Sequence, residues 1–189
     1  MKNVNRMHGH CNFSHIVFSE VINRVGYPNT ILELGCGNGG NLGKFSKVKI
    51  RIGIDPDEKN IENARYRDID CSFILGDHTF LTHFDDNEFY LSFTFSVLDH
   101  MEDFRPALKE MMRISKNVIL FEPTISGEDR LALPEETRWW KITWYHDYER
   151  WLKLGDFKYT IEKYPLYDEG SGELYHLIHI NSEDSFLPG

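Results

Sequence analysis

The sequence predicts an α/β domain: a doubly wound, mostly parallel seven-stranded sheet with helices on both faces and a C-terminal antiparallel hairpin. Strand-like and helix-like apolar periods alternate along the chain, which is typical of a parallel sheet covered on both faces by helices. The two segments that close this order are both strand-like and are joined by the turn DEGSG, which predicts a hairpin. No repeat, low-complexity tract or linker interrupts the pattern.

The first predicted element is a helix over residues 13–25, FSHIVFSEVINRV. Its apolar residues share one helical face, and they are Ile16, Val17, Val21 and Ile22. Gly26 and Pro28 follow, and both residues end helices.

The expected strands span residues 30–34, 49–55, 71–77, 88–95, 117–123, 157–166 and 173–180. Helices are expected to open near Gly39 and to cover residues 57–67, 104–114 and 144–154. Pro56 precedes helix 57–67, and Gly155 ends the last helix. The inward face of helix 104–114 consists of Ala107, Leu108, Met111 and Met112. The stretch 124–143 has no regular pattern.

Length and composition fit one domain over residues 1–189, in which 1–27 form an N-terminal lid and helix and 124–148 form a substrate-side insertion. Hydrophobic residues make up 41% of the chain, which is enough for a real core. The 3 cysteines are widely spaced and show no CxxC, so reduced thiols are expected.

Charge and hydropathy exclude several classes of partner. A formal net charge of −9 provides no basic field for phosphates, so nucleic acid is not an expected partner. No apolar run approaches the roughly 20 residues that span a bilayer, and the polar start lacks the apolar core of a signal peptide. We therefore expect a cytoplasmic monomer or homodimer without membrane contact.

A glycine-rich turn follows the first strand in the sequence ILELGCGNGG. Gly35, Gly37 and Gly40 satisfy GxGxxG, a spacing that serves dinucleotides but also occurs in ordinary tight turns. In a doubly wound fold this turn lies at the carboxyl ends of the strands, where ligands bind. Glu33 brings a carboxylate to the edge of the turn, which favours a cationic ligand over a pyrophosphate.

Four segments in order resemble the class I S-adenosylmethionine-dependent methyltransferases, from about residue 30 to 122. LELGCGNGG is similar to the glycine-rich motif of that family, the acid that ends the second strand follows Gly35 by twenty residues, and LGDHTF and FSVLDHM resemble two later segments. The resemblance implies S-adenosylmethionine as cofactor and S-adenosylhomocysteine as product. It implies that the cofactor-binding residues are Glu33, Gly35, Cys36, Gly37, Asp55, Pro56, Asp77, His78 and Phe95.

The chemistry of two acids agrees with this resemblance. A carboxylate has two acceptor oxygens, so Asp55 can take both hydroxyls of a ribose. Asp77 offers an acceptor to the amino group of adenine. The alternative for each acid is a helix N-cap or a solvated loop residue.

The methyl acceptor is less well defined by the sequence, because methyl transfer needs mainly alignment, with a base only when the acceptor carries a proton. His100 follows the fourth strand and is the expected general base, since an imidazole has an ordinary pKa near 6.5. Tyr145 and His146 are further catalytic candidates in the segment after the fifth strand. The alternatives are a backbone-bonded His100, and a buried tryptophan stripe with His146 facing water.

We expect no metal site. The pair Asp99-His100 resembles only half of a metal-binding pattern found in some methyltransferases, because Ser96 occupies the earlier acidic place. His8, His10, Cys11 and His15 lie close together in MHGHCNFSH, but their spacing matches no recognised zinc site. Contact of this N-terminal segment with the substrate, as a lid, is the other possibility for it.

The sequence thus predicts a methyltransferase that acts on oxygen or nitrogen of a small molecule, in an aromatic-lined pocket formed by residues 124–148 and the N-terminal segment. Two alternatives remain open. One is an enzyme that uses S-adenosylmethionine without transferring its methyl group, and the other is a silent cofactor-binding subunit that stabilises an active partner.

Overall fold

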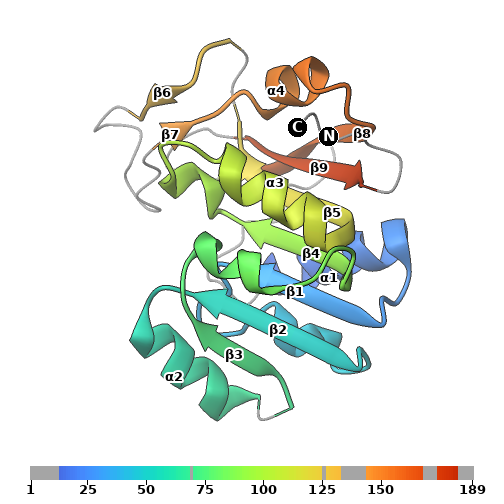
Figure 1. Ribbon diagram of the computed structural model, residues 1–189, viewed down its shortest axis with the longest axis vertical. Helices are drawn as coiled ribbons and strands as arrows, with labels where there is room; N and C mark the ends of the chain where they lie inside the picture. The colour runs from blue at the N-terminus through green and yellow to red at the C-terminus, as the bar shows by residue number, and fades with distance from the viewer. Residues whose placement is uncertain (1–12, 69, 125–126, 133–143, 168–173, 183–189) are drawn as a thin grey trace.

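The computed structural model describes residues 13–68, 70–124, 127–132, 144–167 and 174–182 (Figure 1). Seven strands form the main sheet: β1 (Thr30–Leu34), β2 (Ile50–Asp55), β3 (Ser72–Leu75), β4 (Phe89–Phe95), β5 (Ser115–Pro123), β8 (Tyr159–Tyr167) and β9 (Leu174–Asn181). Four α-helices accompany them: α1 (Phe13–Val25), α2 (Glu58–Arg67), α3 (Arg105–Ile114) and α4 (Tyr148–Leu154). Three 3₁₀ helices are η1 (Leu42–Phe45), η2 (His78–His83) and η3 (Leu98–His100).

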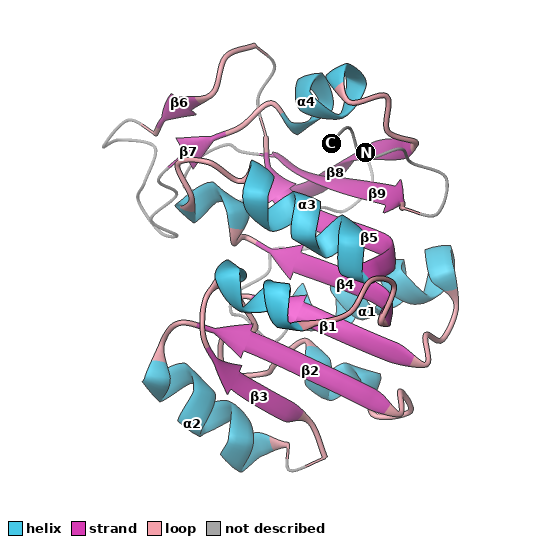
Figure 2. Ribbon diagram, viewed as in Figure 1, coloured by secondary structure: helices cyan, strands magenta, loops and turns pink. Residues whose placement is uncertain are grey.

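The strand order in the sheet is β3-β2-β1-β4-β5-β9-β8. β1 pairs in parallel with both β2 and β4, and β5 pairs in parallel with β4. β9 is antiparallel to both β5 and β8, and Figure 2 shows its arrow running against those of β1, β2 and β4. The predicted doubly wound sheet with a C-terminal hairpin is confirmed, and the strand order reverses between β1 and β4.

Helices cover both faces of the sheet. On one face the core contains the inward side of α3 and the buried residues of α4, and on the other it contains those of α1, η1 and α2. In Figure 1, α3 lies in front of the sheet and α1 behind it. The predicted inward residues of α3 are all buried, and they are Ala107, Leu108, Met111 and Met112. Burial of such side chains drives the layers together.

Two predicted helices are wrong in detail. The helix expected to open near Gly39 is only the 3₁₀ turn η1, because the glycine-rich sequence around Gly43 disfavours helix and β2 begins soon afterwards. The helix expected from residue 144 begins at Tyr148, because Asp147 caps it by accepting from Arg150 N at 2.9 Å.

A second, two-stranded sheet was not predicted. β6 (Arg130–Leu131) lies in the stretch expected to be irregular, and it pairs antiparallel with β7 (Trp144–Tyr145), where a helix was expected to begin. Of the predicted lid and insertion, residues 1–12, 125–126 and 133–143 lie outside the described residues. None of the helices in the described part of the chain has the length and apolar character needed to cross a bilayer.

Candidate active site

The glycine-rich turn lies where the strand order reverses, at the carboxyl end of β1. Its backbone is tied to the neighbouring strand, since the N–H groups of Gly35 and Cys36 both donate to Ile54 O, at 2.7 and 3.0 Å. The switch point of a doubly wound sheet is the place where such folds bind ligands.

Two positions of the turn require glycine, each for a different structural reason. Gly35 has φ +72°, and a Cβ there would lie 2.3 Å from Val97 Cγ2, so the loop after β4 packs directly on it. Gly37 has φ +50°, and a Cβ there would meet no atom within 4 Å. The turn is therefore filled on the Gly35 side and open on the Gly37 side, as a ligand approaching the backbone requires.

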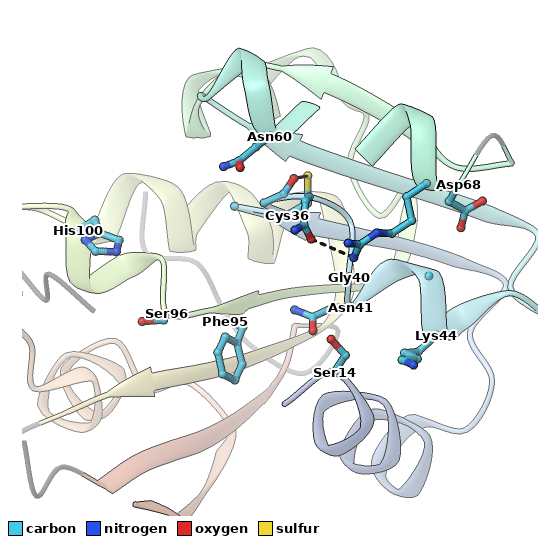
Figure 3. A pocket seen from close by; sticks show the side chains of 15 residues that line it. Ser14, Cys36, Gly40, Asn41, Lys44, Asn60, Asp68, Phe95, Ser96 and His100 are labelled. Carbon is cyan, nitrogen blue, oxygen red and sulfur yellow. Dashed lines mark hydrogen bonds between the residues drawn. The ribbon is translucent and has the colours of Figure 1, made fainter. Parts of the chain in front are cut away.

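A cavity of about 730 Å³ opens beside this turn (Figure 3). Figure 3 shows Ser96 and His100 on one side of it and Lys44 and Asp68 on the opposite side. Five of the predicted site residues line it, namely Gly35, Cys36, Gly37, Phe95 and His100. Burial raises the pKa of the Cys36 thiol, so this wall carries a neutral thiol. The cavity has the size of small-molecule sites in general.

Glu33 is buried beneath the turn with an incomplete set of hydrogen bonds. Its Oε1 accepts from Asn41 Nδ2 at 2.6 Å, and Asn41 lines the cavity. Its Oε2 is buried and has no hydrogen-bond partner in the described part of the chain. Burial raises the pKa of this carboxyl well above its ordinary value. A cationic donor that reached Oε2 would satisfy the atom and reverse that shift.

Asp55 organises the turn from the end of β2. Its Oδ2 accepts from Gly37 N at 2.8 Å, and its Oδ1 accepts from Asp57 N at 3.0 Å and from Asn60 Nδ2 at 3.1 Å. Three of about four acceptor positions of the carboxylate are thus used. With the turn in this conformation, Asp55 has room for one further donor, and Asn60 lines the cavity beside it.

Asp77 is an exposed N-cap at the start of η2, the alternative that the sequence left open. Its Oδ1 accepts from Thr79 N at 2.8 Å and from Thr79 Oγ1 at 2.6 Å, and these bonds lower its pKa. Asp77, His78 and Pro56 do not line the cavity within the described part of the chain. The structure brings them to the same edge of the sheet as the turn, at the ends of β2 and β3.

His100 ends η3 and presents a half-exposed side chain to the cavity. Its Nε2 lies 3.9 Å from Oδ2 of the fully buried Asp99. Ser96, at the end of β4, has φ +52°, an uncommon conformation for a residue with a side chain, and it also lines the cavity. Strained backbone of this kind is concentrated at functional sites.

Tyr145 and His146 do not reach the cavity through any described contact. Tyr145 is 3% exposed and His146 is fully buried, so the expected alternative that His146 faces water is wrong. His146 Nε2 donates to Met101 O at 2.8 Å, and its Nδ1 lies 3.2 Å from Asp129 Oδ2. His146 therefore connects the segment that follows β7 to Met101, the residue after His100. It can do so because Tyr145 and His146 precede helix α4 and do not lie within it.

No group of three or more His, Cys, Asp or Glu side chains that could hold a metal ion occurs among the residues that the structure describes. Of the pair Asp99-His100, His100 lines the cavity and Asp99 is buried behind it, and Ser96, in the earlier acidic place of the metal-binding pattern, offers a hydroxyl. His8, His10 and Cys11 lie outside the described residues.

Sequence reasoning missed the amides of the site and the acid on β5. Asn41 and Asn60 line the cavity and hold the two predicted acids, Glu33 and Asp55. Their distances from those acids in the sequence match no common motif. Glu122 is buried at the end of β5, and only its place at the carboxyl edge of a parallel sheet signals it.

The cavity has an open glycine turn on one side and a half-exposed imidazole on the other, and the buried acceptor oxygen of Glu33 lies beneath the turn. Such a site can hold a cationic, ribose-containing ligand by the turn and can accept a proton on the far side.

Comparisons with known proteins concern the domain and the fold. Residues 32–118 match the family model described as a methyltransferase domain. The PH0226 protein from Pyrococcus horikoshii OT3 is 18% identical, with a TM-score of 0.72, and the match covers 93% of this chain and 92% of that one.

Two more solved structures share the fold. Geranyl diphosphate C-methyltransferase from Streptomyces coelicolor A3(2), solved with Mg²⁺, geranyl diphosphate and S-adenosylhomocysteine, is 14% identical with a TM-score of 0.70, over 90% of this chain and 77% of that one. The bifunctional kinase-methyltransferase WbdD is 18% identical with a TM-score of 0.65, over 96% of this chain and 40% of that one. The resemblance to class I methyltransferases is confirmed in fold and in the matched domain.

Proposed function

We propose that this chain is an S-adenosylmethionine-dependent methyltransferase that acts on a small molecule, starting from the premise that residues 32–118 form a class I methyltransferase domain. One observation carries the proposal: the cavity beside the open Gly37 backbone is bounded on its far side by the imidazole of His100. A bound cofactor and an acceptor on the His100 side would share this one cavity.

The residues present fit the cofactor. Gly37 leaves space against the backbone, and the orphaned Oε2 of Glu33 suits a donor from the amino-acid end of S-adenosylmethionine. Asp55 has one acceptor position left for the ribose, so Asn60 is the natural partner for the second hydroxyl. Asp77 and His78 are proposed to meet the adenine, with Cys36, Pro56 and Phe95 in contact with the rest of the ligand.

The cofactor supplies an electrophilic methyl group on a sulfonium. When the acceptor is a hydroxyl, its oxygen forms the new bond to the methyl carbon, the sulfur–carbon bond breaks, and the hydroxyl proton must leave. His100 is the proposed acceptor of that proton, because its ring lines the cavity. A neutral amine acceptor would depend on His100 much less.

The remaining catalytic candidates are proposed in a supporting role. Tyr145 and His146 are buried, and His146 donates to Met101 O, next to His100, so both are proposed to position the acceptor side of the cavity. The proposed acceptor atom is an oxygen or a nitrogen. We also propose that the chain works as a monomer or homodimer and does not bind nucleic acid.

The proposal is tested by incubating the chain with a small-molecule extract and S-adenosylmethionine that carries a deuterated methyl group. Mass spectrometry should find a metabolite that gains one labelled methyl with wild type and gains none with Gly37→Val. Fragmentation then assigns the methyl to oxygen, nitrogen or carbon. Cofactor binding without any labelled product would favour the silent-subunit alternative, and consumption of the cofactor without methyl transfer would favour the non-methylating one.

A further inference from the structure

Two buried carboxyl groups lie directly behind the cavity wall, at the ends of β4 and β5. Asp99 and Glu122 have no exposed surface, and they contact each other. Two side chains of the cavity wall reach Asp99: Ser96 Oγ donates to its Oδ1 at 3.4 Å, and His100 Nε2 lies 3.9 Å from its Oδ2. The proposed base thus has a buried acid as its neighbour.

The environment of the pair disfavours the charged form of both carboxyls. Burial raises the pKa of both, and for Glu122 the nearby Asp99 raises it further. Two carboxyls in contact disfavour each other's ionisation, so the pair resists carrying two negative charges. Against this, the nearby His100 lowers the pKa of Asp99.

The two acids have different neighbours. Glu122 is fixed by Val97, whose N–H donates to both of its carboxylate oxygens at 3.1 Å. Asp99 Oδ2 is buried and makes no hydrogen bond within the described part of the chain. His100, a residue on the cavity wall, has its ring Nε2 3.9 Å from this oxygen, so Asp99 holds an unused acceptor beside His100.

We propose that Asp99 is the positioning residue of His100, directing the Nε2–H of the imidazole to its own Oδ2 and leaving Nδ1 to take the proton of the acceptor. This inference rests on the proposed function, because it concerns the base of that reaction. Glu122 anchors the loop by accepting from the N–H of Val97. Contacts of this kind are often long without ligand and shorten in the productive complex.

The first test measures the ring itself and needs no acceptor. Nitrogen-15 spectra of the chain with S-adenosylhomocysteine at pH 8, assigned with His100→Gln, report which ring nitrogen of His100 carries the proton. Wild type should show the proton on Nε2 alone, and Asp99→Asn should show both tautomers. Asp103→Asn removes a half-exposed acid nearby and should leave the spectrum unchanged.

A proton on Nδ1 in wild type would overturn the proposal, and this result needs no variant to fold. Identical ring signals in wild type and a folded Asp99→Asn chain would overturn it as well. If S-adenosylhomocysteine does not bind, the proposed function fails, and the spectrum of the free chain still answers the question about Asp99.

The second test is a double-mutant cycle with the acceptor found by methyl labelling. Asp99→Asn should lower the single-turnover rate about 10- to 100-fold, as expected for the partner of a functional histidine, with unchanged affinity for S-adenosylhomocysteine. In a His100→Ala background the same change should have little further effect. Asp99→Glu, which keeps the carboxylate, should restore part of the rate. Equal losses in both backgrounds would mean that Asp99 acts on the structure and not through His100.

Discussion

The two sides of the cavity use different parts of the chain. On the side of the glycine turn, backbone groups and a fixed carboxylate set the shape: Gly37 has a positive φ and its N–H is held by Asp55 at 2.8 Å. On the side of β4 and β5, the functional groups are ionisable side chains behind the wall, Asp99 and Glu122, with His100 in front of them.

This difference predicts which property of the protein a substitution on each side of the cavity should change. A turn defined mainly by its backbone is most sensitive to steric change, whereas the pair of buried acids responds mainly to charge and pH. We therefore expect changes in the turn to abolish cofactor binding, and changes near His100 to alter the reaction or the stability while the cofactor still binds.

The largest effect is expected for Gly37→Val. The new side chain projects into the cavity, so S-adenosylhomocysteine should no longer bind at detectable affinity in calorimetry. Gly26→Val is the matched control, because Gly26 has φ +69° and also meets no atom within 4 Å, but it follows α1 away from the cavity. Equal loss of binding in both variants would mean that backbone strain, and not the cavity, is responsible.

His100→Ala tests the other side. If the acceptor is a hydroxyl, the single-turnover rate should fall by about 10² to 10⁴ while cofactor affinity stays near wild type. His83→Ala, at an exposed histidine of η2, should change neither quantity. If His100→Ala and wild type have equal single-turnover rates at every pH from about 5.5 to 9, an interval that includes the usual pKa of histidine, His100 is not the base.

Asp55→Ala joins the two kinds of effect, because Asp55 holds the turn and is also the proposed partner of the ribose. Its loss should weaken S-adenosylhomocysteine binding by about 1 to 3 kcal/mol. The 2′-deoxy and 3′-deoxy analogues separate the two roles: wild type should prefer the ribose form over both, and Asp55→Ala should lose its preference over one of them, since Asn60 is the proposed partner of the other hydroxyl. A preference that survives over both analogues in the variant would place the ribose elsewhere.

The smallest effect concerns stability. Burial first, then Asp99, raises the pKa of Glu122 well above its ordinary value of 4.5. The folded chain then keeps a proton that the unfolded chain loses, so wild-type stability should fall as pH rises above that ordinary value. Glu122→Gln removes this dependence.

The melting temperature of Glu122→Gln relative to wild type should therefore rise between pH 5 and pH 8, by about 2 to 4 °C for each kcal/mol. Glu62→Gln, at an exposed site on α2, should show no such trend. A difference that shrinks with rising pH would contradict the assigned direction.

The comparison also explains what could be predicted from the sequence. The turn was predictable because glycines at fixed spacing after an apolar strand report the backbone directly, and the observed β1 has the predicted bounds. The side of β4 and β5 could not be predicted in the same way. Asp99, Glu122 and His146 come from segments whose proximity depends on the pairing of β4 with β5 and on the unpredicted β6–β7 sheet. Asp147, read as part of a helix, is instead its cap, which moved Tyr145 and His146 out of the helix.

The most direct test of the central claim, that the cavity at the glycine turn holds S-adenosylmethionine, is calorimetric titration of the wild-type chain with S-adenosylhomocysteine and, separately, with NAD. We predict one S-adenosylhomocysteine per chain with a dissociation constant of about micromolar order, and no binding of NAD. Absence of S-adenosylhomocysteine binding up to about millimolar concentration, or a preference for NAD, would contradict the account.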